Sequence, residues 1–309
     1  TVGASASYFK QLSPDLNLSG FLYLSRYTME GVNNDLANEQ RLIQNNSVEE
    51  KGLKLKLDYN INPRFNFKMG YQLNETGVGN LEDINAPLFR RYIKEVIISN
   101  SLINELSFIS KDTKTSFNTG LRTNYIDKFS KFIVEPRLSV SHQLSKKWQL
   151  EILAEKKSQY VSQAVYFQND FLGIEKRRWK LSNNSSIPIV QSSQVSLGLH
   201  YNKNNWLFSM DSYYKKVNGI TTRSQGFQNQ YQFVDAIGLY EVKGIDFLVQ
   251  KKWSVFTSWL TYSLSQNEYD FKALNSQTNF PNNYSVEHAF SWSINHSFNS
   301  SLRNRQDPN

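Results

Sequence analysis

The feature that most constrains this chain is an alternation of apolar and polar residues that recurs along most of its length. In the run 64–74, Phe65, Phe67, Met69 and Tyr71 share one parity, and polar or small residues occupy the other. Successive side chains of a β-strand point to opposite faces, so this pattern predicts a strand with one apolar face. The pattern recurs in the runs 116–125, 131–143, 148–155, 195–201, 208–214, 245–250 and 290–295.

The predicted strands are long. Including weaker runs, we expect about thirteen, near residues 3–11, 15–28, 49–60, 64–74, 90–110, 114–126, 130–143, 147–157, 189–202, 204–218, 239–251, 252–266 and 284–298. A globular strand typically has about 5–6 residues, whereas a tilted strand needs about 9–11 residues to cross a bilayer. A soluble sandwich also alternates, but the strand lengths favour an all-β fold, namely a transmembrane antiparallel β-barrel.

The connections alternate between short and long, which is typical of outer-membrane barrels with tight periplasmic turns and long extracellular loops. Short turns are expected near 12–14, 61–63, 111–113, 144–146, 203 and 251–252, and long loops near 29–48, 75–89, 158–188, 219–238 and 267–283, with 127–129 as one short member of the long series. Trp148, Trp206 and Trp253 each follow a polar turn at the expected first strand position. They predict an interfacial aromatic girdle.

Two further signals lie inside the predicted strands. Pro136 interrupts a strand and removes a ladder donor, which predicts a bulge or a pairing gap. Gly120, Gly198 and Gly244 leave room for bends or for close approach of an inner element.

Composition excludes several other classes. The chain of 309 residues has no run of about 18 apolar residues, which argues against a helical membrane protein. It has no cysteine, so a disulfide scaffold and Cys-ligated metal centres are excluded. The net charge of +8 forms no obvious stripe, and we expect no nucleic acid partner. The sequence shows no catalytic motif and its four histidines are scattered, so we expect no enzyme, no cofactor and no metal site.

Ordered motifs in the second half carry a family resemblance. Residues 120–144 read GLRTNYIDKFSKFIVEPRLSVSHQL, followed by IPIVQSSQVSLGLHY (187–201), DSYYKKVNGI (211–220), GLYEVKGIDFLVQKKW (238–253) and EHAFSWSIN (287–295). In order and spacing, from about residue 114 to 296, they resemble the barrel strands of TonB-dependent outer-membrane receptors, especially those of Bacteroidetes type. No single motif is specific, but the ordered set is.

The resemblance implies a 22-stranded barrel in the outer membrane of a Gram-negative bacterium, filled by an N-terminal plug. It implies import of a scarce or large nutrient (a ferric siderophore, a cobalamin or an oligosaccharide) with energy delivered by TonB of the TonB-ExbB-ExbD complex. The sequence departs from this pattern, because it shows about thirteen strands and neither a plug nor a TonB box. We therefore expect residues 1–309 to be a single domain, an internal segment of the barrel.

The expected partners are the receptor's own plug, TonB, outer-membrane lipid and a small-molecule or glycan ligand, with a surface lipoprotein as a further candidate. Two alternatives remain at this point. One is a passive porin-like or assembly-related outer-membrane barrel. The other is a soluble, basic β protein that binds glycans.

Candidate functional residues fall into two groups. Charged residues on the polar parity are expected to line the lumen: Arg122, Glu135, Arg137, Glu151, Glu155, Asp211 and Asp246. Aromatic and cationic residues in the loops 158–188 and 219–238 suit an anionic or glycan-like ligand through charge and stacking: Tyr160, Tyr166, Phe167, Arg177, Arg178, Trp179, Arg223 and Tyr231. Ordinary loop packing is the competing interpretation of the second group.

Overall fold

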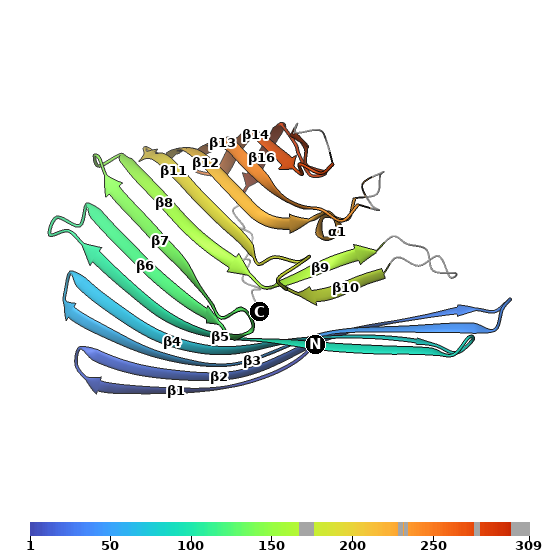
Figure 1. Ribbon diagram of the computed structural model, residues 1–309. Helices are drawn as coiled ribbons and strands as arrows, with labels where there is room; N and C mark the ends of the chain where they lie inside the picture. Colours follow the sequence, from blue (N-terminus) through green and yellow to red (C-terminus); the bar gives the residue numbers. More distant parts are fainter. Residues whose placement is uncertain (167–175, 228–230, 232–233, 275–278, 298–309) are drawn as a thin grey trace, which may run out of the picture.

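Thirteen long antiparallel strands form one continuous, strongly curved sheet in the computed structural model, which describes residues 1–166, 176–227, 231, 234–274 and 279–297 (Figure 1). The strands are β1 (Val2–Ser13), β2 (Leu16–Asp35), β3 (Gln40–Asn62), β4 (Phe65–Ile84), β5 (Phe89–Ile109), β6 (Thr115–Ile126), β7 (Lys131–Gln143), β8 (Trp148–Gln159), β11 (Val190–Lys203), β12 (Trp206–Thr221), β13 (Ile237–Lys252), β14 (Phe256–Asp270) and β16 (His288–His296). The short strand β15 (Phe280–Pro281) also pairs with β14. The predicted all-β, antiparallel architecture and strand number are confirmed.

The sheet order follows the sequence with one omission. A separate hairpin, β9 (Val161–Tyr166) and β10 (Lys176–Leu181), leaves the sheet after β8, so that β8 pairs directly with β11. This hairpin lies on the concave side of the curved sheet (Figure 1). Within the described residues the sheet stays open, because β1 pairs with β2 alone and β16 with β14 alone. The sheet is therefore part of a barrel wall.

The two faces of the wall differ as the alternation predicts. Large apolar side chains of one parity remain exposed on the convex face, among them Leu121, Leu197 and Phe208. On the concave face, charged residues such as Arg122 and Glu135 meet across neighbouring strands. An exposed apolar face of this extent is the surface that a barrel presents to lipid.

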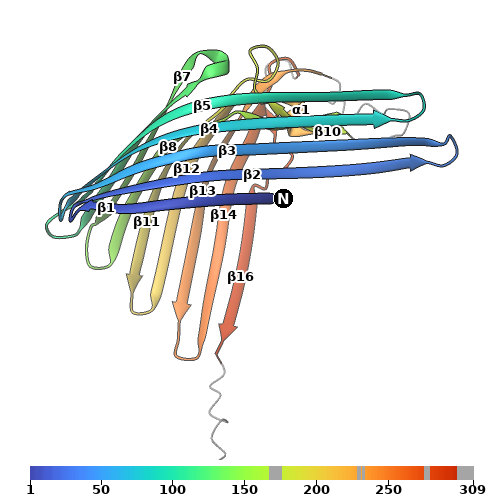
Figure 2. The same ribbon diagram turned by 90° about the horizontal axis from the view of Figure 1, so that it is seen from below.

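Two of the expected loops are strands instead. The segments 29–48 and 75–89 continue β2–β3 and β4–β5 as regular ladders, and turns of four residues close them at 36–39 and 85–88. Figure 2 shows both hairpins projecting well beyond the other strands. Their side chains are polar on both faces in places, so apolar periodicity fades while backbone pairing continues. The prediction of loops there was wrong for that reason.

The short turns lie at the opposite rim. Asn204 and Asn205 form a two-residue turn with φ of 53° and 62°, the conformation favoured by the twist of a β-hairpin. Trp148 and Trp206 begin β8 and β12, as predicted. Trp253 lies instead in the turn before β14, where its ring stacks on Phe256 with centroids 4.2 Å apart.

A pairing gap at Pro136 lets the chain leave the wall. The β7–β8 ladder runs from Gln143 to Arg137 and stops next to Pro136, the residue that has no backbone N–H to donate. Beyond this point the Glu135 carboxylate accepts hydrogen bonds from both the backbone N–H and the hydroxyl of Ser158. A side chain thus replaces the lost ladder partner, and β8 can turn inward toward β9. The predicted gap is confirmed.

Two inward-facing tyrosines lie over glycines of the neighbouring strand. Tyr23 pairs with Gly52, and Tyr213 pairs with Gly244. A Cβ on either glycine would overlap the tyrosine ring. The Tyr23 hydroxyl donates to Asn74 Oδ1 at 2.7 Å across Gly52. These rings fill the gaps that the glycines leave in the concave face.

The described helical segments are short. The 3₁₀ turn η1 (Asp127–Phe129) joins β6 to β7, and α1 (Thr222–Gln225) follows β12. No helix in the described ranges has the length and apolar character needed to cross a membrane.

We expect Gly52→Ala to destabilise the full-length protein by about 1–3 kcal/mol, because the added methyl displaces the Tyr23 ring. The measurement is urea unfolding in detergent micelles, in which the gel mobility of the folded barrel reports the folded fraction. Gly31→Ala is the matched control, since nothing lies within 4 Å of a Cβ there. In a Tyr23→Ala background, Gly52→Ala should lose its effect. An equal cost in both backgrounds would disprove the packing explanation.

Candidate functional site

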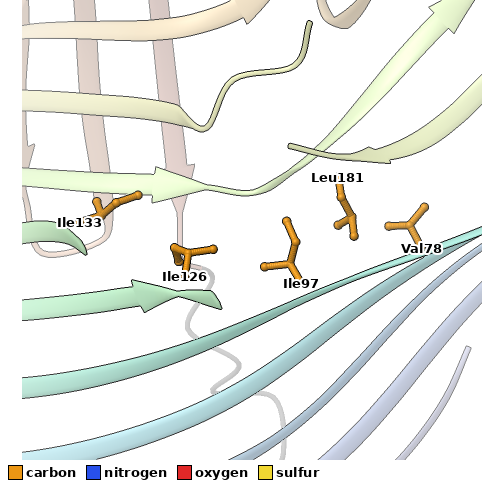
Figure 3. Packing of buried hydrophobic residues seen from close by; sticks show 5 residues of the cluster. All are labelled: Val78, Ile97, Ile126, Ile133 and Leu181. Atoms are coloured by element: carbon orange, nitrogen blue, oxygen red, sulfur yellow. The ribbon is translucent and has the colours of Figure 1, made fainter. Parts of the chain in front are cut away.

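The hairpin β9–β10 packs onto the concave face of the extended strands. Leu181 of β10 joins Val78, Ile97, Ile126 and Ile133 in a buried apolar cluster, shown in Figure 3. Tyr160 and Trp179 pack against the same cluster. Val78 lies in the extension of β4 that sequence analysis took for a loop, and this extension therefore provides part of the floor on which the hairpin rests.

Polar contacts fix the position of the hairpin. Arg178 of β10 forms an ion pair with Glu82 of β4, and their side chains are 15% and 10% exposed. Burial lowers the pKa of Arg178, so the nearby carboxylate matters for keeping the charge inside the protein. The Asn80 amide donates to the Trp179 carbonyl at 3.0 Å. These contacts bind β10 to a strand that is about a hundred residues away in sequence.

A cavity of about 370 Å³ lies between the hairpin, the segment after it and the β12–β13 connection. Its polar lining includes Ser162, Lys180, Ser186, Arg223 and Asp235. Hydroxyl groups and charges from two separate connections, β8–β11 and β12–β13, therefore converge at one place, the usual composition of the polar part of a ligand pocket.

Lys180 gives this cavity a positive character. In the described part of the chain it makes no ion pair within 4 Å, although it is only half exposed. Burial lowers the pKa of Lys180, and the positive charge of Arg178 adds to that effect. An anion placed beside Lys180 would oppose both effects.

The helix α1 positions Arg223 at the cavity. Thr221 caps the helix by accepting from Ser224 N at 3.1 Å, and Ser224 Oγ accepts from Thr221 N at 3.0 Å, which is a reciprocal capping arrangement. Arg223 Nη2 then donates to Asp235 Oδ2 at 2.8 Å. This hydrogen-bonded pair holds the pKa of Asp235 below its usual value and ties the two ends of the β12–β13 connection together.

An aromatic cluster supports the same connection. Phe227 contacts Tyr269 and Phe271 edge-on, with centroids 5.2 and 5.7 Å apart, and Tyr231 packs on Phe280 at 5.7 Å. Burial raises the pKa of Tyr269 to about 12. The cluster keeps the far end of β14 packed beneath α1.

The predicted ligand-binding residues divide into three sets. Arg223 lines the cavity. Tyr160, Arg178, Trp179 and Tyr231 pack against the wall or the aromatic cluster. Phe167 lies outside the described residues, as do the side chains of Tyr166 and Arg177, whose backbones belong to β9 and β10. Ligand binding by these residues stays a prediction.

The charged residues expected in the lumen share the parity of the concave face. Arg122 lies 4.0 Å from buried Glu135. Arg137 and Glu155 pair across β7 and β8 and line a groove of about 450 Å³.

Nearer the short-turn rim, the same face carries a second charged group. His200 Nε2 lies 3.7 Å from Glu151 and 3.8 Å from Asp211, and Asp246 pairs with Asp211 across β12 and β13. In the described ranges, these groups form no cluster of three or more that could hold a metal ion.

Sequence analysis missed Lys180, Glu82 and Asp235. Lys180 lay within the loop that was singled out, but the choice favoured aromatics and the neighbouring arginines. Glu82 lay in a segment taken for a loop, so no signal placed it opposite Arg178. For Asp235, the one available hint was that it follows Arg223 within the same connection.

No known protein-family model and no curated protein sequence matches the chain. Solved structures do. The unliganded ferric citrate transporter FecA matches with a TM-score of 0.67 and 12% identity, over 95% of this chain and 46% of that one. The ferric yersiniabactin uptake receptor FyuA from Yersinia pestis matches with 0.63 and 10%, over 95% and 46%. The RagAB peptide transporter matches with 0.56 and 11%, over 87% and 36%.

The open curved wall, its long strands and its inward hairpin define an outer-membrane β-barrel fold. More specifically, the fold is that of the barrel wall of TonB-dependent receptors, as the sequence resemblance predicted. The chain spans less than half the length of each of the three proteins named above.

Glu82→Gln should release the hairpin from the wall, because it leaves the Arg178 charge buried without a counter-ion, at a cost of about 3–5 kcal/mol. Hydrogen exchange of the backbone amides of β9 and β10 in the full-length protein measures the release. Lys128→Gln is the control, since the side chains of Lys128 and its partner Glu95 are 34% and 36% exposed, and pairs open to solvent contribute less than about 1 kcal/mol. Exchange rates that Glu82→Gln leaves unchanged would rule out the anchoring role.

Proposed function

We propose that this chain forms part of an outer-membrane receptor that binds a nutrient at the cell surface and imports it with energy from TonB. The observation that carries the proposal is the polar cavity built from inward-folded connections on the concave side of a receptor-type barrel wall. A passive pore needs an open lumen, whereas a receptor needs a pocket that holds its ligand before transport.

The ligand contacts are assigned to this cavity. Arg223 and Lys180 supply charge, and Ser162, Ser186 and Asp235 supply hydrogen-bonding groups. Tyr166 belongs to β9, Arg177 belongs to β10, and Phe167 follows Tyr166 in the sequence. These three residues are further candidate contacts. The other four predicted residues support the hairpin and the β12–β13 connection, since their side chains pack against the wall and the aromatic cluster: Tyr160, Arg178, Trp179 and Tyr231.

The nutrient is a ferric siderophore, a cobalamin or an oligosaccharide. The similar structures are a ferric citrate transporter, a ferric yersiniabactin uptake receptor and a peptide transporter, so the shared wall is compatible with chemically different ligands. The proposed partners are the receptor's own plug, which the concave charged face would contact, TonB, outer-membrane lipid and a surface lipoprotein. The proposal assigns the chain no catalysis.

Uptake by the full-length protein should depend on energy. Cells that carry the gene should accumulate one member of a panel of radiolabelled iron chelates, cobalamin and oligosaccharides, and an uncoupler or loss of TonB should abolish that accumulation. Accumulation that continues without TonB would identify a passive pore instead.

Ser186→Trp should weaken binding of the transported ligand by about tenfold, because an indole would occupy part of the cavity. Equilibrium binding to whole cells measures the affinity. Ser254→Trp adds the same group to an exposed position in the turn before β14, at the opposite rim, and should leave affinity unchanged. Equal affinities for both variants would place the ligand site elsewhere.

A further inference from the structure

The rim of the wall that carries the short turns has a cluster of cations for which the receptor function gives no role. Lys147 lies in the turn before β8, Lys203 is the last residue of β11, and Lys251 is the next to last residue of β13, so each lies beside one of three neighbouring turns. Lys203 pairs with Trp206 across β11 and β12, and Trp206 pairs with Lys251 across β12 and β13. Directly paired residues point to the same face, so Trp206 lies between two lysines on the convex face.

Two of these ammonium groups approach each other, and the third lies on the other side of Trp206. The Lys147 side chain approaches Lys203, which ends β11 at the rim beyond the apolar band, and lowers the pKa of Lys203 through that contact. The Lys251 ammonium lies 4.7 Å from the centre of the Trp206 ring and 3.1 Å from the Asn204 carbonyl. Across the described ranges, none of the three lysines has a carboxylate within 4 Å.

An exposed apolar surface begins directly beside the cations. The Trp206 ring stacks on Phe208 with centroids 5.4 Å apart, and Tyr201 packs on Phe208 and Trp148 at 5.7 and 5.0 Å. Phe208 and Met210, further along β12, are each 39% exposed. The surface therefore changes within one strand from concentrated positive charge, through aromatic rings, to open apolar side chains.

We propose that Lys147, Lys203 and Lys251 bind the phosphate of an anionic phospholipid, while Trp206 packs against the start of its acyl chains. The phosphate would contact the cations that flank the Trp206 ring, and the apolar band provides the surface along which the chains extend. Indole rings favour this boundary because one end is apolar and the other can be hydrated. The proposal rests on the membrane location in the proposed function.

An acidic peptide is the competing occupant, but it would leave the apolar half of the surface uncovered. Lys203 and Lys251 share their face with Phe208 and Met210, and a ligand with both an anionic head and apolar tails fits both parts. Charge complementarity and continuity with the apolar band together favour the lipid.

The test is titration of the full-length protein in detergent micelles with phosphatidylglycerol or phosphatidylcholine, with the bound lipid counted by native mass spectrometry. The wild type should prefer phosphatidylglycerol. Because each lysine near the headgroups contributes about fivefold in affinity, Lys203→Gln should weaken that binding about fivefold, and the further changes Lys147→Gln and Lys251→Gln should weaken it more. The preference should also fall as salt is raised.

Matched variants separate charge from position. Replacing Lys10, Lys111 and Lys114 by Gln removes the same charge from the same rim, away from Trp206, and should leave the preference intact. Replacing Lys147, Lys203 and Lys251 by Arg should preserve binding and shows that folding tolerates changes there. An equal loss in the control variant, or a wild type without preference, would refute the lipid site.

Two further outcomes identify other occupants. Displacement of phosphatidylglycerol by the same concentration of inorganic phosphate, or equal binding of a soluble polyglutamate peptide, would overturn the assignment to lipid. Reconstitution into bilayer nanodiscs separates this proposal from the previous one. A protein that fails to insert contradicts the membrane receptor itself, whereas one that inserts without preferring anionic lipid contradicts the lipid site alone.

Discussion

The structure depends on backbone hydrogen bonding between neighbouring antiparallel strands. In hydrocarbon every N–H and C=O must find a partner within the protein, and a continuous ladder is one of the few arrangements that achieves this. Once the register of the ladder is fixed, the position of each residue along its strand decides which face of the sheet its side chain occupies. The apolar convex surface and the charged concave surface both follow from that alternation.

The ladder also explains which parts of the fold sequence analysis could predict. Strands within the apolar band carry an alternating pattern because lipid demands it, and those strands were found with their directions. Beyond the band alternation is not required, so the continuations of β2, β3 and β4 looked like loops although their backbones pair without interruption. Pro136 could be interpreted correctly because the missing donor is a property of the residue itself.

Side-chain partners between distant segments were harder to predict. Arg178 and Trp179 were selected for ligand binding from their chemical type, yet the structure packs both against the wall. The cause lies in Glu82 and the apolar cluster, neither of which carries a local signal that points to β10. Lys180, the neighbour left without a carboxylate in the described ranges, has the same residue type as many surface lysines. Its cavity arises from two connections that meet only after folding.

The pairing gap beside Pro136 has a consequence for the order of assembly. Neither β9 nor β10 lies between two strands of the wall, since β8 pairs with β7 on one side and with β11 on the other. The wall can therefore form its complete ladder while the hairpin is still undocked, and the burial of Leu181 and Arg178 adds a later, separate step. By then β8 and β11 hold both ends of the hairpin segment, so docking closes a loop of about thirty residues and not one of a hundred. The cavity beside the hairpin is accordingly completed after the wall that supports it.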